Sequence, residues 1–189
     1  GLGDVYKRQV LRRSTHVPVV GVEPAIKPAA QASNCGRIGV VATRATLESV
    51  GFRSLIQRFA SHTTVFAREG SGWVEQVERG DLTSAYTQGV VSRVITPLSE
   101  EGVDHIVLGC THYPFLLPVI KATLADSYVI VTDPALAVAR RINQLLQDHS
   151  PAHCDKRYQF LTTSNTTEYM EKLLPVLIDA PYPITTVPL

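Results

Sequence analysis

Short runs of apolar, β-branched residues alternate with helical patterns along most of this chain. The clearest runs are residues 37–42 (RIGVVA) and 103–109 (VDHIVLG). A continuous apolar run of this length is typical of a strand buried on both faces, as in a parallel sheet covered by helices. The sequence therefore predicts an α/β fold, an open and mostly parallel Rossmann-like sheet with flanking helices.

The remaining elements follow from the same patterns. Further strands are expected at residues 17–22, 62–67, 128–131 and 158–162. Helices are expected to begin near residues 24, 46, 73, 81, 114, 134 and 166. Asp81 is a candidate N-cap, Pro97 is expected to kink or end the fourth helix, and Pro114 is placed at the first position of the fifth.

Length and composition exclude several classes of protein. The 189 residues allow one domain, or one domain and part of a second. A net charge of +1 makes a nucleic-acid partner improbable, and no apolar run is long enough to span a membrane. Three cysteines without CxxC spacing favour a reducing, cytoplasmic setting over a disulfide scaffold or a thiolate metal site. Neither GxGxxG nor GxxxxGK[ST] occurs, so nucleotide cofactors are unsupported.

Cys110, Thr111 and His112 are the strongest candidates for a functional site. They follow a buried strand and precede a helix, and ligands of open α/β sheets bind beyond the carboxyl ends of the strands. A helix N-terminus favours a substrate carboxylate and is expected to lower the pKa of the Cys110 thiol. His112 can exchange a proton with that thiol. The structural alternative is a small buried cysteine beside a hydrogen-bonded histidine.

Three further residues are weaker candidates. Thr43 and Thr46 occupy the turn after the strand at residues 37–42, where their hydroxyls can cap a helix or reach a substrate. Glu75 follows a glycine-rich turn, and its carboxylate can orient a cationic imidazole or simply face solvent. The histidines show no metal-ligand spacing, so no metal site is expected.

The chain resembles the glutamate racemases of the aspartate/glutamate racemase superfamily. The resemblance rests on VLGCTHYP at residues 107–114, IGVVATRAT at 38–46 and VPVVGV at 17–22. The stretch EPAIKPAA at residues 23–30 is closest to the gammaproteobacterial branch. The matching segments run from about residue 10 to residue 177 and weaken after residue 148.

The resemblance implies cofactor-independent interconversion of L- and D-glutamate by two cysteines on opposite faces of the α-carbon. Cys110 is similar to the second of these cysteines, His112 would assist it, and Glu75 falls near a glutamate thought to steer catalysis. Thr111 and His112 would contact the substrate, and Thr43 and Thr46 are candidates for substrate contact from their position after a strand. The Cys-Asn-Thr/Ser turn that carries the first cysteine in the family does not occur in this sequence. The chain alone is therefore expected to be inactive.

The expected organisation follows from the same resemblance. Residues 1–9 are interpreted as a non-native leader, residues 10–131 as a complete lobe, and residues 132–189 as a C-terminal part of a truncated first lobe. The resemblance implies glutamate as the substrate and peptidoglycan synthesis as the use of D-glutamate. It allows a UDP-linked peptidoglycan precursor as activator and a homodimer. The alternatives are an aspartate or hydantoin racemase, or a noncatalytic carboxylate-binding α/β module.

Overall fold

A four-stranded parallel sheet forms the centre of the protein. The structure is a computed structural model that describes residues 9–125, 127–147, 160–163, 167–177 and 183–187. Strands β1 (Arg37–Ala42), β2 (Thr64–Glu69), β3 (His105–Leu108) and β4 (Ile130–Thr132) lie in the order β2-β1-β3-β4. All three pairings are parallel. The predicted open parallel α/β sheet is confirmed.

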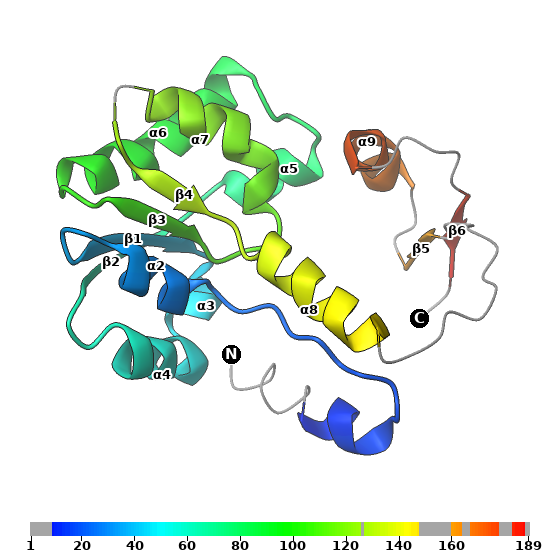
Figure 1. Cartoon of the computed structure of the whole chain (residues 1–189). Coiled ribbons are helices and arrows are strands. Elements are labelled where there is room, and N and C mark those ends of the chain that lie inside the picture. The colour runs from blue at the N-terminus through cyan, green and yellow to red at the C-terminus, as the bar shows by residue number, and fades with distance from the viewer. Residues whose placement is uncertain (1–8, 126, 148–159, 164–166, 178–182, 188–189) are drawn as a thin grey trace.

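Helices cover both faces of this sheet (Figure 1). One face carries α5 (Trp73–Glu78), α6 (Ala85–Glu100) and the pair η1 (Tyr113–Leu116) and α7 (Leu117–Thr123). The other carries α2 (Ile26–Ala32) and α4 (Val50–Phe59), the latter preceded by the single turn α3 (Arg44–Leu47). Successive residues of the central strands point to opposite core clusters, with Ile106 in one and Val107 in the other. Two covered faces explain why β1 and β3 are continuously apolar.

The C-terminal part of the chain extends from the sheet. Helix α8 (Ala135–Gln147) follows β4, and a parallel pair is formed by β5 (Phe160–Thr162) and β6 (Ile184–Thr186). No residue of α8 is buried, and Leu136 and Leu146 are among its exposed apolar side chains. Helix α9 (Glu168–Leu177) places Leu173 in the same core cluster as α5 and α6. Part of the C-terminal segment thus packs against the sheet lobe.

Four sequence predictions need correction. Residues 17–22 form no strand, because no described strand lies beside them to accept and donate backbone hydrogen bonds. The carbonyl of Val19 accepts a hydrogen bond from the guanidinium of Arg12. Helix α6 continues past Pro97 to Glu100, and its N-cap is Ser84, whose hydroxyl donates to Asp81. Pro114 lies in the short 3₁₀ helix η1 and not at the start of an α-helix. Residues 1–8, most of the expected leader, lie outside the described residues.

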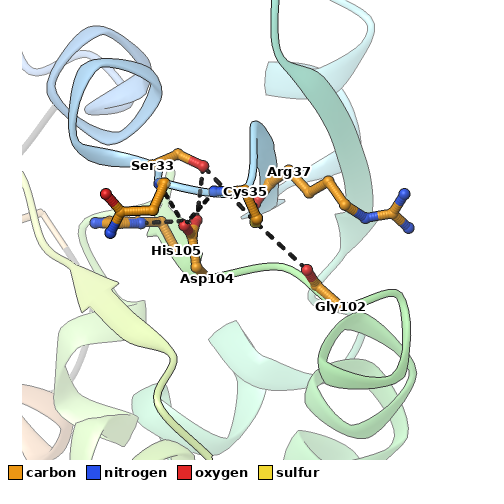
Figure 2. A network of polar contacts seen from close by, with 7 residues as sticks. Ser33, Cys35, Arg37, Gly102, Asp104 and His105 are labelled. Atoms are coloured by element: carbon orange, nitrogen blue, oxygen red, sulfur yellow. Dashed lines mark hydrogen bonds and ion pairs between the residues drawn. The ribbon is translucent and has the colours of Figure 1, made fainter.

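A carboxylate ties the sheet together at the amino ends of β1 and β3 (Figure 2). Asp104 accepts hydrogen bonds from the hydroxyl of Ser33 at 2.7 Å and from the backbone N–H groups of Asn34 and Cys35 at 2.6 and 3.0 Å. The Nδ1 atom of buried His105 lies 2.9 Å from the same carboxylate. The turn between α2 and β1 is thereby fixed to the residue before β3.

These hydrogen bonds decide the protonation of Asp104. Burial alone raises the pKa of its carboxyl group, but the hydrogen bonds from His105, Ser33, Cys35 and Asn34 outweigh burial. They hold the pKa far below its ordinary value. Asp104 is therefore a carboxylate throughout the neutral range.

No helix in the described part of the chain is long and apolar enough to cross a membrane.

We expect Asp104→Asn to lower the free energy of unfolding by about 1–3 kcal/mol at pH 7, because Asn cannot accept the same set of hydrogen bonds. A group with a depressed folded-state pKa stabilises above its unfolded pKa, about 3.9, and loses that contribution as pH falls through the folded pKa. The difference between the two proteins should be constant near neutrality and shrink below about pH 4. Urea titrations at several pH values measure it, with Glu48→Gln, an exposed carboxylate, as control. A difference that grows toward acid pH would contradict this assignment.

Candidate active site

The candidate residues gather at the carboxyl ends of β1 and β3. The N–H of Gly109 donates to the carbonyl of Val41 at 2.8 Å, so the parallel pairing extends to the last residues of both strands. A Cβ atom on Gly109 would lie 2.8 Å from that of Ala42. Glycine therefore permits the close approach of the two strand ends. Thr43 and Cys110 follow directly at this edge.

Thr43 is the N-cap of α3, and Thr46 lies within this helix. The side-chain oxygen of Thr43 accepts from the N–H of Thr46 at 3.3 Å, and the two hydroxyl oxygens are 3.0 Å apart. The predicted capping role of Thr43 is confirmed. Contact of either hydroxyl with a substrate stays a prediction.

Cys110 and His112 face each other across a tight turn. The Sγ atom of Cys110 lies 3.9 Å from Nδ1 of His112, and the N–H of Tyr113 closes the turn by donating to the carbonyl of Cys110 at 3.2 Å. Cys110 is partly buried, whereas Thr111 between them is exposed. The imidazole is thus placed to take a proton from the thiol or return it.

A carboxylate that sequence reasoning did not single out reaches the other side of His112. The Oε1 atom of Glu78, the last residue of α5, lies 3.6 Å from Nε2 of the imidazole. Glu75, the predicted carboxylate, is exposed three residues earlier on the same helix. Residues three apart share a helix face, so Glu75 and Glu78 lie on the same side of α5, and the sequence alone does not show which of them reaches His112. The structure therefore aligns Cys110, His112 and Glu78.

The predicted low pKa of Cys110 is wrong for this structure. Burial disfavours the thiolate and raises the pKa of the thiol, while the N–H groups of His112 and Tyr113 act in the opposite direction and do not outweigh it. The expected helix N-terminus is also absent from this position, because only the short η1 follows and α7 begins at Leu117. Cys110 thus needs a nearby proton acceptor to become a nucleophile or base at neutral pH.

The described residues contain no group of three His, Cys, Asp or Glu side chains arranged to hold a metal ion. The chemistry that the site offers is proton transfer between a thiol, an imidazole and a carboxylate. An arrangement of this kind can remove a proton from a weak carbon acid held next to the sulfur.

A family model described as Asp/Glu/Hydantoin racemase matches residues 7–142. The chain belongs to the Asp/Glu/hydantoin racemase family. The match includes β1, β3, the Cys110 turn and α5, so the described site lies inside the shared region.

Relatives in this family are named as glutamate racemases. A protein from Pseudomonas paraeruginosa is 41% identical over 89% of this chain and 64% of its own length. The crystal structure of Escherichia coli glutamate racemase, in complex with L-glutamate and the activator UDP-MurNAc-Ala, has a TM-score of 0.78 at 33% identity. It covers 89% of this chain and 64% of the other. A Bacillus anthracis glutamate racemase gives a TM-score of 0.77 at 25% identity, over 96% and 68%.

This racemase-family chain spans a little under two thirds of the Pseudomonas and Escherichia relatives. About a third of the length of these relatives has no counterpart here. Any group that a relative supplies from that remaining third is outside this sequence.

The electrostatics of Cys110 can be tested by alkylation. We expect iodoacetamide to modify Cys110 in the native chain with a pH midpoint above about 8.5, the ordinary cysteine value, because burial disfavours the thiolate. In the urea-unfolded chain the midpoint should return to that value. Peptide mapping separates Cys110 from Cys35 and Cys154. A native midpoint equal to or below the unfolded one would restore the original expectation of a low pKa.

Proposed function

We propose that this chain provides one part of a cofactor-independent glutamate racemase. The observation that carries the proposal is the alignment of Cys110, His112 and Glu78 at the carboxyl edge of the sheet. The comparisons support the proposal, because relatives about 40% identical to this chain are named as glutamate racemases. The family model also includes aspartate and hydantoin racemases, which remain the alternative substrates.

Racemisation requires one base and one acid on opposite faces of the α-carbon. In one direction, His112 takes the proton of the Cys110 thiol, and the thiolate then removes the α-proton of the substrate. The C–H bond breaks as an S–H bond forms. A second thiol, from the part of the protein that this chain does not span, gives its proton to the opposite face. In the reverse direction the two cysteines exchange roles.

The raised pKa of Cys110 gives His112 and Glu78 their role in this scheme. A buried thiol ionises more easily when an imidazole within reach accepts its proton, and the Glu78 carboxylate stabilises the imidazolium that forms. Glu75 is the alternative carboxylate for this role.

Substrate contacts are proposed for Thr111, Thr43 and Thr46, together with His112. The three threonine hydroxyl groups and the imidazole lie on the turns that follow β1 and β3, where hydrogen-bond donors can hold the carboxylates of an amino acid. Glutamate and aspartate differ by one methylene, so the choice between them depends on how much room the site of the full-length protein leaves for the side chain of the substrate.

We also propose a cellular role, an activator and an oligomeric state, on the basis of the family. D-Glutamate formed by the enzyme would supply peptidoglycan synthesis in the cytoplasm. A UDP-linked peptidoglycan precursor is proposed as an activator, because the Escherichia coli relative was crystallised with UDP-MurNAc-Ala. A homodimer is a further proposal, and neither nucleic acid nor a membrane is expected as a partner.

The central test is racemisation in D₂O. The 189-residue chain alone should form no D-glutamate, since it offers one base to a reaction that needs two. A full-length protein, made by adding the N-terminal lobe of the Pseudomonas relative, should racemise glutamate without pyridoxal phosphate or metal and incorporate deuterium at Cα. Cys110→Ala should abolish turnover, while Cys35→Ala, the matched control at an exposed thiol, should retain it. D-Glutamate formation by the chain alone would refute the two-part proposal.

A second test separates the two carboxylates of α5. In the full-length protein, Glu78→Gln should lower kcat about fivefold, the upper range for an exposed ion pair, because the imidazolium loses its partner. Glu75→Gln removes the same charge from an adjacent turn of the same helix and should change kcat little. If steady-state assays show a larger loss of kcat for Glu75→Gln than for Glu78→Gln, Glu75 and not Glu78 is the carboxylate that assists His112.

A further inference from the structure

Two buried aromatic rings join α5 to the turn that carries His112. Trp73, the first residue of α5, and Tyr113, the first residue of η1, are 0% and 1% exposed. Their ring centroids are 4.8 Å apart at an interplanar angle of 66°, an edge-to-face contact. The indole N–H of Trp73 also donates to the carbonyl of Val90 in α6 at 3.1 Å. The start of α5 is therefore fixed between α6 and the site turn.

The carbonyl of Gly70 completes this contact. It accepts from the N–H of Trp73 at 3.1 Å and from the hydroxyl of Tyr113 at 3.4 Å. A Cβ atom on residue 70 would lie 2.6 Å from the Tyr113 hydroxyl oxygen, so only glycine leaves room for the ring in this position. Gly70, Trp73 and Tyr113 together form what we call the aromatic clamp.

The aromatic clamp is connected to both partners of the contact between His112 and Glu78. Tyr113 directly follows His112, whereas Trp73 and Glu78 are the two ends of α5, about 7.5 Å apart along its axis. A shift of α5 relative to the turn would change the 3.6 Å separation of Glu78 and His112 directly. An edge-to-face ring pair resists such a shift because both rings are close-packed and fully buried.

We propose that Tyr113 is a positioning residue that holds α5 against the site turn and so sets the contact between His112 and Glu78. This inference rests on the proposed function, in which that contact assists Cys110. Tyr113 acts through its position and not as an acid. Its hydroxyl is directed to Gly70, and burial, together with the charges of Cys110, Glu69 and Glu75, raises its pKa and keeps the phenol neutral.

A double-mutant cycle on this chain tests the inference without requiring racemase activity. The measured quantity is the rate of Cys110 alkylation by iodoacetamide at pH 7 in wild type, Glu78→Gln, Tyr113→Leu and the double variant. Glu78→Gln should slow alkylation about twofold, since a less stabilised imidazolium stabilises the thiolate less. In the Tyr113→Leu background the same change should have no effect, because the contact is already lost. Tyr113→Phe keeps the ring, and in that background the twofold effect should return.

Gly70→Ala displaces Tyr113 without removing it and should uncouple Glu78 from Cys110 as Tyr113→Leu does. Gly89→Ala is its matched control, because a Cβ atom there meets nothing within 4 Å. Tyr86→Leu, at a tyrosine that is 62% exposed, is the control for loss of a ring. Circular dichroism identifies any variant that fails to fold. The folded variants then show whether Glu78 is still coupled to Cys110.

The outcomes separate this inference from the proposed function. If Glu78→Gln slows alkylation equally in wild type and in the Tyr113→Leu and Gly70→Ala backgrounds, Tyr113 does not position the contact and the inference is refuted. If Glu78→Gln has no effect in wild type, the assistance of Cys110 by Glu78 is refuted, and the inference is refuted with it. Loss of coupling in both backgrounds, with recovery in Tyr113→Phe, supports it.

Discussion

The parallel pairing of β1 with β3 is the contact on which the rest of the structure depends. Both strands are buried, and each is covered by helices on two faces, so their register fixes the positions of α2, α5 and α7 together. The pairing is secured differently at its two ends. At the amino end the Asp104 carboxylate joins the two chain segments, and at the carboxyl end Gly109 allows them to approach closely. The candidate site occupies the second end.

At both ends burial raises the pKa of an acidic group, and the hydrogen bonds to that group decide its protonation. Asp104 is surrounded by four hydrogen-bonding groups, which stabilise its charged form beyond the cost of desolvation. Two backbone N–H groups, those of His112 and Tyr113, lower the pKa of the Cys110 thiol, and there desolvation dominates. The first arrangement is suited to a fixed structural charge. The second leaves a neutral thiol whose ionisation depends on a neighbour, and the proposed function uses this property, because there the thiol both gives and receives a proton.

The sequence predicted the parts of this fold that are determined locally. Strand β1 lies at residues 37–42 as expected, and the strands expected at 62–67 and 128–131 are displaced by about two residues. Residues 17–22 have the same apolar pattern, yet Val17 is 69% exposed and the segment is not a strand. A strand requires a partner, and periodicity does not report whether one is present.

The site shows the same division between local and tertiary information. The motif at residues 107–114 located Cys110 and His112, because the chemistry of a strand end and a turn is encoded in neighbouring residues. The pKa of Cys110 and the choice of Glu78 over Glu75 depend on how deeply the turn is buried and how α5 lies against it. Both are set by contacts between segments about 40 residues apart, such as that of Tyr113 with Gly70. Identifying the candidate thiol from sequence is therefore easier than identifying the groups that surround it, because those groups are selected by packing.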